Sequence, residues 1–452
     1  MITLKDCKEF TAGVWLVEPV DDLAEVSVET DSRKDCSNSI FVAFEGERFD
    51  AHNFLEEVIL QGVKAICVHK KPNLDLLQKA VDKKVAVLNV DNTIKAYQDL
   101  ATGKLGKSKC KVIGITGSSG KTSAKAILMQ MLEEVALGKV LSTIANTNNH
   151  IGVPQNVLRL EETHEYAVIE MGTNNPGEIA TLARCASPDI AVITSIGDSH
   201  SGNFPKNGIL YEKSDIVKYM KEDGVAVIPV DLKSDILSTR ALEGKTHITF
   251  GGQGADTEVE YVNGHLQNSE MIIEGELVQC SLTGSHQAQN VAACVSVMKH
   301  LGFSLYEYKS CFEKLELPGM RMKVFEENGV TWVNDAYNAN PQSMLGFMEW
   351  LRNIPGIVKN YKNRFLVLGD MLELGDNSLS FHQQVIDNLP ENWKVVGVGS
   401  YFCDAAKGTF PTFETSEAAS EFLKNKILAE DLVALKGSRG IKLEKICNQF
   451  RN

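Results

Sequence analysis

The sequence predicts a three-domain α/β protein with a central phosphate-binding domain. The chain has 452 residues, which corresponds to about three domains at roughly 150 residues each. Short apolar runs alternate with helix-length amphipathic segments, the pattern of strand and helix units in parallel sheets. A glycine-rich loop joins one such run to a helix near Lys121, and a loop in that setting is typical of phosphate binding.

Residues 1–91 are predicted to form a small N-terminal α/β domain. Strand-like runs occupy 39–46, 63–68 and 85–90, and a polar turn fills 47–54. A helical stretch and the glycine- and lysine-rich segment at 102–111 follow, and such a segment is a turn-prone lead into a new domain.

Residues 92–315 are predicted to form the central domain around a parallel sheet. The runs at 166–171 and 190–196 are almost continuously apolar, as in strands buried on both faces. Residues 245–282 indicate short β-meander strands appended to that sheet. The helix that begins near Lys121 has apolar residues at the spacing of one buried face, namely Ala124, Ile127, Leu128, Met131, Leu132 and Val135.

Residues 316–452 are predicted to form a C-terminal, Rossmann-like domain. Four apolar runs, at 330–335, 365–370, 394–399 and 432–437, alternate with helix-length segments. This is the pattern of a second parallel, doubly wound sheet.

Composition limits the function. The net charge of -13, from 46 basic and 59 acidic residues, argues against nucleic-acid binding, which needs a basic surface. The ten cysteines are scattered without a C-x-x-C pair, which argues against a zinc site or a disulfide framework. The N-terminus lacks a signal-peptide pattern, and no apolar run approaches the roughly 20 residues that cross a bilayer. We therefore expect a cytoplasmic, monomeric protein that does not insert into membranes.

The glycine-rich loop departs from the generic phosphate loop. Residues 111–123 are K-V-I-G-I-T-G-S-S-G-K-T-S, and the generic motif needs glycine six residues before the lysine, where this chain has Ile115. Backbone N–H groups of 117–120 and the start of the next helix are still expected to converge on one anion. Lys121 would reach the terminal phosphates and Thr122 would offer its hydroxyl to Mg²⁺. The candidate residues of this loop are Thr116, Gly117, Ser118, Ser119, Gly120, Lys121, Thr122 and Ser123.

Other polar residues follow predicted strands. Glu170 and His200 come at or after strand ends, where α/β proteins bind ligands, although each alone is more often an ordinary surface or hydrogen-bonded residue. Lys213 alone would pass as a surface lysine. A second candidate wall follows the last sheet, at Asp335 and at Lys436, Ser438 and Arg439. A hydrogen-bonded, asparagine-rich turn is an equally good interpretation there.

Taken together, these stretches resemble the Mur ligases, which form amide bonds with ATP in the synthesis of bacterial peptidoglycan precursors. The family's loop is T-G-x-x-G-K-[ST], here Thr116 to Thr122, so it explains the missing glycine. The resemblance covers essentially the whole chain and is strongest to the branch that joins UDP-N-acetylmuramoyl-tripeptide to D-alanyl-D-alanine. The segments that carry it are T-D-S-R-K (30–34), F-V-A-F-E-G-E-R-F-D-A-H-N-F (41–54), N-T-N-N-H-I-G-V-P (146–154), V-I-E-M-G (168–172), N-D-A-Y-N-A-N-P-Q-S-M (334–344), L-G-D-M-L-E-L-G (368–375) and K-G-S-R (436–439).

The resemblance implies roles for these residues. Thr122 and Glu170 would hold the Mg²⁺ that bridges the ATP phosphates, and His200 would belong to a second metal site. Lys213 falls where the family has a lysine carbamylated by CO2, which would turn a cation into a carboxylate-like metal ligand and needs a neutral amine. Four residues would contact ATP from outside the loop: Asn290, Arg321, Asp335 and Asn338. The implied substrate-binding residues are Ser32, Arg33 and Arg48 in the uridine-nucleotide domain, Asn148 and Asn149 near the muramoyl group, and Lys436, Ser438 and Arg439 in the last domain.

The implied reaction phosphorylates a peptide carboxylate with ATP and then lets an amine displace phosphate. The implied catalytic set is Lys121, Glu170, His200, Lys213, Asn290, Arg321 and Asp335. Two departures from the family pattern are S-G-N-F after His200 and glutamine at position 287 in G-S-H-Q.

Three alternative functions stay open from the sequence. A folylpolyglutamate-type ligase with another acceptor would leave 30–54 without a role, and a small-molecule kinase would leave 334–344 unexplained. A catalytically silent relative that binds UDP-sugars is the third alternative, and intact Lys121, Glu170 and Lys213 argue against it.

Overall fold

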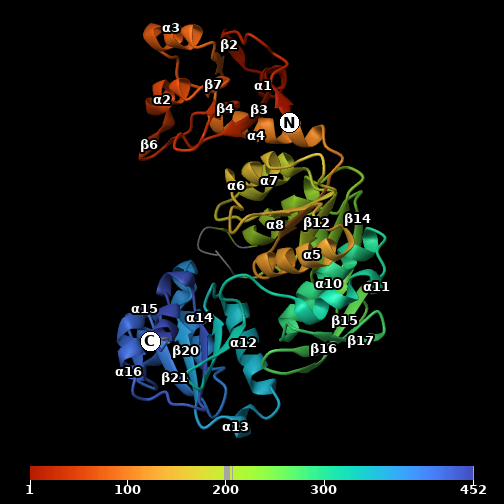
Figure 1. Cartoon of the computed structure of the whole chain (residues 1–452). Coiled ribbons are helices and arrows are strands. Elements are labelled where there is room, and N and C mark those ends of the chain that lie inside the picture. Colours follow the sequence, from red (N-terminus) through yellow and green to blue (C-terminus); the bar gives the residue numbers. More distant parts are fainter. Residues whose placement is uncertain (198–203, 206, 451–452) are drawn as a thin grey trace. The chain divides into compact units, whose positions relative to one another are not determined.

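The computed structural model describes residues 1–197, 204–205 and 207–450 (Figure 1). The chain groups into two compact units. The first contains residues 1–114, 138–171 and 180–189, and the second contains 115–137, 172–179 and 190–452. Among the described residues, no helix combines the length and the apolar character needed to span a membrane.

A six-stranded sheet in the order β1-β3-β4-β7-β8-β2 lies in the first unit. β3, β4, β7 and β8 run parallel, and β1 and β2 pair antiparallel at the edges. All residues of β4 and β7 are buried, as their position in the middle of the sheet requires. The elements are β1 (Ile2–Thr3), α1 (Leu4–Thr11), β2 (Val14–Val17), β3 (Glu25–Glu29), β4 (Ser39–Val42), α2 (Leu55–Leu60), β7 (Ala65–Val68), α3 (Leu74–Asp82), β8 (Ala86–Asn89) and α4 (Thr93–Gly106).

The strand predicted at 39–46 is wrong in its second half. β4 ends at Val42, and β5 (Glu45–Gly46) pairs antiparallel with β6 (Phe49–Asp50) in a separate short hairpin. Residues 45–49 are exposed, because the charged residues there cannot continue a buried strand.

A nine-stranded sheet has the order β10-β11-β9-β12-β13-β14-β15-β16-β17. The runs predicted at 166–171 and 190–196 are confirmed as β11 and β12. The antiparallel meander predicted at 245–282 is confirmed only for its last strands. β14 pairs parallel with β13, and β15 pairs parallel with β14. β16 pairs antiparallel with β15, and β17 pairs antiparallel with β16. The strands are β9 (Lys111–Thr116), β10 (Val140–Ser142), β11 (Tyr166–Glu170), β12 (Ile190–Ile193), β13 (Val225–Pro229), β14 (Thr246–Gly251), β15 (Thr257–Gly264), β16 (Ser269–Ile273) and β17 (Glu276–Cys280).

Helices accompany this sheet, and their buried residues follow the predicted apolar faces. In α5 all of the predicted face is buried except Val135, which is half-buried at the last residue of the helix. The helices are α5 (Lys121–Val135), α6 (Gly152–Leu158), α7 (Glu178–Ala186), α8 (Gly208–Lys218), α9 (Lys233–Ser238), α10 (Ser285–His300) and α11 (Leu305–Tyr308).

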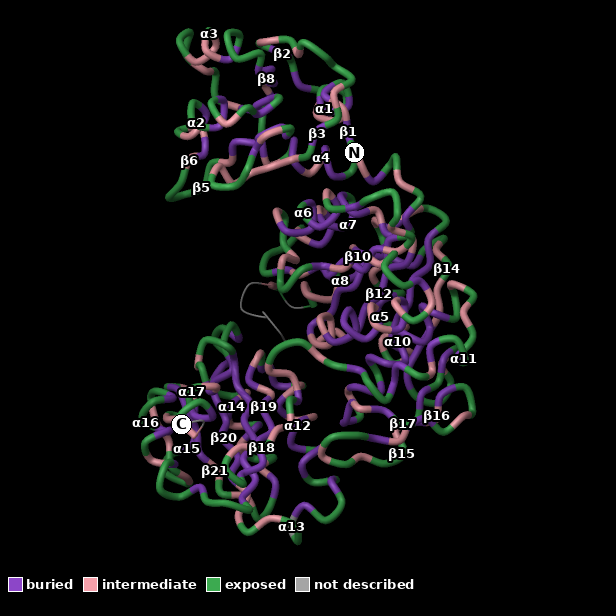
Figure 2. The backbone as a smooth tube through the Cα atoms, in the orientation of Figure 1, coloured by how far each residue is buried: buried purple, intermediate pink, exposed green. Residues whose placement is uncertain are grey.

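The third sheet has six strands in the order β18-β19-β23-β20-β21-β22. Leu366 and Leu368 enter one core cluster, and Phe365 and Val367 enter another, so both faces of β20 are covered, as in a doubly wound fold. Buried residues, purple in Figure 2, make up most of β19, β20, β21 and β23, whereas β18 and β22 at the edges contain none. The elements are β18 (Lys323–Glu327), β19 (Val330–Asp335), α12 (Pro341–Asn353), α13 (Ile357–Asn360), β20 (Arg364–Gly369), α14 (Ser378–Ile386), β21 (Lys394–Val398), α15 (Ser400–Ala406), β22 (Thr412–Phe413), α16 (Ser416–Leu423), β23 (Leu432–Lys436) and α17 (Glu444–Asn448).

The position of β23 determines where polar side chains gather. Although it is the last strand in the chain, β23 pairs parallel with both β19 and β20. Asp335, which ends β19, is therefore the register partner of Lys436, which ends β23. The segments predicted as a second binding wall meet at this edge of the sheet.

Candidate functional site

The segment that follows β12 holds the glycine-rich loop. Ser118 donates its backbone N–H to the Ser195 carbonyl, and Ser119 donates its N–H to the Ser195 hydroxyl, both at 2.9 Å. The Ser118 hydroxyl lies 3.0 Å from both the N and the O of Gly197. The N–H groups of Ser118 and Ser119 are therefore both bonded to Ser195, and the convergence of the N–H groups of 117–120 on one anion stays a prediction.

Two glycines of the loop cannot be replaced without a clash. Gly117 and Gly120 have φ angles of 156° and 86°, which side chains rarely adopt. A Cβ atom on Gly117 would lie 2.0 Å from the Thr194 hydroxyl, and one on Gly120 would lie 2.4 Å from Oδ1 of Asn290. The loop thus packs closely against Thr194 and against α10.

Two lysines share one acceptor at this loop. Lys121 Nζ donates to the Gly117 carbonyl at 2.6 Å, and Lys213 Nζ donates to the same oxygen at 3.0 Å. Lys213 is 1% exposed, and burial together with the nearby charge of Lys121 lowers its pKa well below the usual value for lysine. The surface lysine expected from the sequence is therefore a buried amine inclined toward its neutral form.

Glu212 precedes Lys213 and is also buried. Its carboxylate accepts hydrogen bonds from the Thr173 hydroxyl at 3.0 Å, from the Gly177 N–H at 2.6 Å and from the Ile179 N–H at 2.7 Å. These bonds fix α8 to the start of α7. The Glu212 carboxylate also attracts the Lys213 ammonium, which partly offsets the lowering of the Lys213 pKa by burial. No pattern in the sequence around Glu212 predicts this role.

Asn290 lies on α10 beside the loop. It is 6% exposed, and its Nδ2 donates to Oε1 of the buried Gln287 at 3.0 Å. The glutamine that departs from the family pattern thus orients the Asn290 amide so that its Oδ1 faces Gly120. On the same helix, burial lowers the pKa of His286 to about 4.

Three predicted residues of the first unit form a local hydrogen-bonded group. Glu170 ends β11, is 2% exposed and accepts a hydrogen bond from Asn148 at 3.0 Å, and its N–H donates to the Thr143 hydroxyl. Oδ1 of Asn149 accepts the Gly152 N–H at 2.8 Å. Asn149 thereby caps the start of α6.

Arg321, Asp335 and Lys436 gather at the edge of the third sheet. Asp335 accepts the Met322 N–H at 3.1 Å on one oxygen and the Lys436 ammonium on the other. Lys436 is 3% exposed, so this is a buried ion pair. Asn338 is exposed, and its carbonyl lies 3.5 Å from the Lys436 ammonium.

Ser438 connects the K-G-S-R segment to the L-G-D-M segment. It donates its N–H to the Asp370 carbonyl at 3.1 Å, and its hydroxyl accepts the Leu372 N–H at 3.0 Å. The Asp370 carboxylate accepts the N–H groups of Tyr401 and Phe402 at the start of α15. Ser438 is thus part of the structural connection between two strand ends.

His382, beside Asp370, is fully buried. Its Nδ1 lies 2.6 Å from the Ser378 carbonyl and its Nε2 lies 3.0 Å from the Met371 N–H. A carbonyl only accepts and an N–H only donates, so the ring is neutral with its proton on Nδ1. Burial lowers the His382 pKa and raises that of Asp370.

Ser32, Arg33 and Arg48 lie in the first unit. Arg33 forms an exposed ion pair with Asp31 at 2.7 Å. The Ser32 carbonyl accepts from the Gln61 side chain at 2.9 Å. Arg48 is exposed in the turn of the β5-β6 hairpin.

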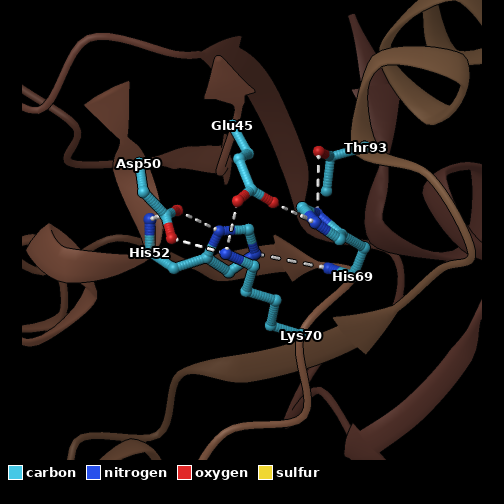
Figure 3. A network of polar contacts seen from close by, with 6 residues as sticks. All are labelled: Glu45, Asp50, His52, His69, Lys70 and Thr93. Atoms are coloured by element: carbon cyan, nitrogen blue, oxygen red, sulfur yellow. Dashed lines mark hydrogen bonds and ion pairs between the residues drawn. The ribbon is translucent and has the colours of Figure 1, made fainter. Parts of the chain in front are cut away.

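A polar network anchors that hairpin (Figure 3). Lys70 donates to Glu45 at 2.8 Å and to Asp50 at 2.7 Å, and both bonds raise the Lys70 pKa. His69 links Glu45 to Thr93. His52 Nδ1 lies 2.7 Å from Asp50, and burial lowers the His52 pKa. Each strand of the hairpin is thus tied to the segment after β7.

The structure brings together some predicted residues and leaves others apart. Gly117, Gly120, Lys121, Lys213 and Asn290 surround the loop, and Arg321, Asp335, Lys436, Ser438 and Arg439 gather at the third sheet. Glu170, Asn148 and Asn149 belong to the other compact unit, and His200 lies outside the described residues. In the part of the chain that is described, no group of three or more His, Cys, Asp or Glu residues is arranged to hold a metal.

Comparisons with known proteins find the same family over nearly the whole chain. Residues 115–298 match the Mur ligase middle domain, and residues 320–439 match the Mur ligase glutamate ligase domain. The UDP-N-acetylmuramoyl-tripeptide--D-alanyl-D-alanine ligase of Bacillus subtilis (strain 168) is 32% identical over 98% of this chain and 97% of that protein.

Solved structures agree with this similarity. A crystal structure of MurF from Acinetobacter baumannii has a TM-score of 0.87 and 30% identity, covering 99% of this chain and 98% of that one. The MurF ligase of Thermotoga maritima, solved in complex with ADP, has a TM-score of 0.82 and 28% identity, covering 96% of this chain and 98% of that one.

Proposed function

The chain belongs to the Mur ligase family, and we propose on that premise that it joins D-alanyl-D-alanine to UDP-N-acetylmuramoyl-tripeptide and converts ATP to ADP and phosphate. The reaction would be one of the nucleotide-linked, cytoplasmic steps of peptidoglycan precursor synthesis, carried out by a monomer. The observation that carries the proposal is the pair of lysines, 121 and 213, at the Gly117 carbonyl of the phosphate loop.

The loop geometry suggests how ATP is received. Lys121 bonds a loop carbonyl, which is a weaker partner for an ammonium than a phosphate oxygen, because the phosphate oxygen carries negative charge and attracts the cation directly. We expect Lys121 to exchange this carbonyl for the terminal phosphates. The Ser119 N–H would likewise exchange the Ser195 hydroxyl for a phosphate oxygen.

The chemistry then follows in two displacements. A peptide carboxylate oxygen attacks the γ-phosphorus of ATP, ADP leaves, and an acyl phosphate forms. The amine of D-alanyl-D-alanine attacks the acyl carbon, phosphate leaves with its electron pair, and the amine loses a proton. The first step sets a carboxylate against a polyphosphate, so cationic side chains are needed, and Lys121 and Arg321 are the proposed ones.

Mg²⁺ fits the proposed donor set. A threonine hydroxyl and a carboxylate, from Thr122 and Glu170, are hard oxygen ligands, and Mg²⁺ commonly uses one or two such ligands together with water and phosphates. We propose that these two residues hold it and that, when bound, it neutralises phosphate charge.

Carbamylation of Lys213 is also proposed. CO2 adds to a neutral amine, which releases a proton and leaves a carbamate anion. The burial and lowered pKa of Lys213 favour the neutral amine. His200 stays a proposed member of the second metal site from the family resemblance alone.

We further propose a division of labour among three domains, with boundaries near residues 91 and 315. Residues 1–91 would bind the uridine nucleotide, with Ser32, Arg33 and Arg48 as contacts. Asn148 and Asn149 would lie near the muramoyl group. Asn290, Arg321, Asp335 and Asn338 would contact ATP, and Lys436, Ser438 and Arg439 would face the incoming dipeptide.

The test measures ADP release with ATP and Mg²⁺, with UDP-N-acetylmuramoyl-tripeptide, and with or without D-alanyl-D-alanine. We expect turnover only when both substrates are present, with a product whose mass is that of the UDP-muramoyl-pentapeptide. L-alanyl-L-alanine is the matched control acceptor. A phosphorylated product without dipeptide would favour the kinase alternative, and turnover with glutamate would favour the folylpolyglutamate-type alternative.

A further inference from the structure

We propose that Tyr337 positions Arg321 for nucleotide binding by carrying its guanidinium on the face of the phenol ring. The inference rests on the proposed function, because it assumes that Arg321 contacts ATP. Tyr337 would not touch substrate and would act through the arginine alone.

The Arg321 guanidinium lies close over the Tyr337 ring. The Cζ atom of Arg321 lies 3.6 Å from the centroid of the Tyr337 ring, well within the roughly 6 Å range of cation–π attraction. A guanidinium is planar and stacks on an aromatic face while its N–H groups stay in its own plane. The stack therefore fixes the plane of Arg321 and leaves its edge to bind anions. One donor, Nη1, bonds the Pro318 carbonyl at 2.8 Å.

The backbone on both sides of Arg321 is tied to the same short segment. The Tyr337 N–H donates to the Met320 carbonyl at 3.2 Å, and the Met322 N–H donates to Asp335 at 3.1 Å. Gly319 turns the chain with a φ of 73°, and a Cβ atom on it would lie 3.5 Å from the Tyr337 ring. Residues 335–337 thus hold both the main chain and the side chain of the arginine.

A second arginine uses the same ring. The Cζ atom of Arg439 lies 5.2 Å from the Tyr337 centroid. Arg439 belongs to the K-G-S-R segment after β23, whereas Arg321 precedes β18. Two loops far apart in sequence therefore meet at Tyr337. The guanidinium groups of Arg321 and Arg439, both proposed to bind ligands, lie near the same ring.

Core packing does not account for this tyrosine. Tyr337 is only half-buried and belongs to neither hydrophobic cluster that covers the third sheet. Its ring contacts charged groups instead. A residue of this kind contributes to the orientation of the arginines more than to the stability of the domain.

The test compares Tyr337→Phe, which keeps the ring, with Tyr337→Leu, which removes it. We expect Tyr337→Leu to raise the KM for ATP and the calorimetric Kd for ADP roughly tenfold, with the KM for UDP-N-acetylmuramoyl-tripeptide changed less than about twofold and an unchanged melting temperature. Tyr337→Phe should restore both constants to within about twofold of wild type. Phe422→Leu is the matched control, because the Lys426 Nζ atom lies 4.6 Å from the centroid of the Phe422 ring in the same domain. This variant should leave the KM for ATP unchanged.

A double-mutant cycle tests whether Tyr337 acts through Arg321. In an Arg321→Ala background, Tyr337→Leu should cost no further kcat/KM for ATP, since the group it positions is gone. The same tenfold loss in that background would overturn the proposal, and so would a tenfold loss in Tyr337→Phe. If the wild-type protein binds ADP but does not ligate, the proposed function fails while the calorimetric comparison still decides the role of Tyr337.

Discussion

The ammonium of Lys213 donates a hydrogen bond to the Gly117 carbonyl at 3.0 Å, from a position that is 1% exposed. This bond joins α8 to the phosphate loop. It also places the buried Lys213 amine next to Lys121, which donates to the same oxygen. The arrangement is costly if both lysines are charged.

Replacing Lys213 with methionine should stabilise the protein and abolish ligation. The pKa of Lys213 is lowered in the folded state, so the unfolded chain binds more protons below its usual value near 10.5, and stability should rise as the pH rises toward that value. Lys213→Met removes this dependence, and we expect a melting temperature higher by about 2–4 °C for each kcal/mol relieved at pH 7.

The measurement is a set of melting curves from pH 7 to 10 in CO2-free buffer. Lys218→Met, at the end of the same helix, is the control and should keep the wild-type pH dependence. A Lys213→Met variant that is less stable than wild type at pH 7 would contradict the account.

Gly120→Ala should impair ATP binding. The added Cβ would meet Oδ1 of Asn290 at 2.4 Å, at a φ of 86°. Strain of about 1–3 kcal/mol predicts a roughly fivefold to 150-fold loss of kcat/KM for ATP. Gly346→Ala in α12 is the matched control, because nothing lies within 4 Å of its added Cβ, and it should keep wild-type kinetics. Equal kinetics in the two variants would show that the loop does not need this glycine.

His382→Leu should destabilise the third sheet's domain by about 2–3 kcal/mol, since it leaves the Met371 N–H and the Ser378 carbonyl without their buried partner. The lowered pKa of His382 means that the unfolded chain takes up its proton first on acidification, so the histidine's contribution to stability falls as the pH drops below about 6.5. Chemical denaturation at pH 7.5 and pH 5.5 measures both effects. His164→Leu, on a short surface turn, is the comparison, and an equal loss there would argue against the buried network.

Lys70→Met should weaken binding of the UDP substrate without changing kcat. Lys70 holds Glu45 and Asp50 of the hairpin that carries Arg48 (Figure 3). Its ammonium is partly exposed, so the expected effect is small, a roughly twofold to fivefold rise in KM. Steady-state kinetics measure it, with the exposed neighbour Lys71→Met as control. A change in kcat alone would place Lys70 in a different role.

The apolar runs that the sequence predicted as strands correspond to observed strands, because such runs are local signals, whereas β1, β2, β3, β10, β13, β18 and β22 were not predicted. The phosphate loop was recognisable for the same reason. Thr194, Ser195 and Glu212 were not recognisable from the sequence. Thr194 and Ser195 contact Ser119, which lies 75 or more positions away in the chain. Glu212 contacts the start of α7. Lys213 carried no sign of its burial, and the pairing of Asp370 with His382 depends on tertiary packing alone. The hairpin at 45–50 was missed because a two-residue strand is too short for a periodic pattern.

The most direct test follows oxygen from the tripeptide into phosphate. UDP-N-acetylmuramoyl-tripeptide labelled with ¹⁸O in its terminal carboxylate would be turned over with ATP and D-alanyl-D-alanine, and the released phosphate and the peptide product would be weighed by mass spectrometry. An acyl phosphate intermediate predicts one ¹⁸O atom in each phosphate released and formation of the pentapeptide. Unlabelled phosphate accompanying the pentapeptide, or phosphate released without any peptide product, would contradict the account.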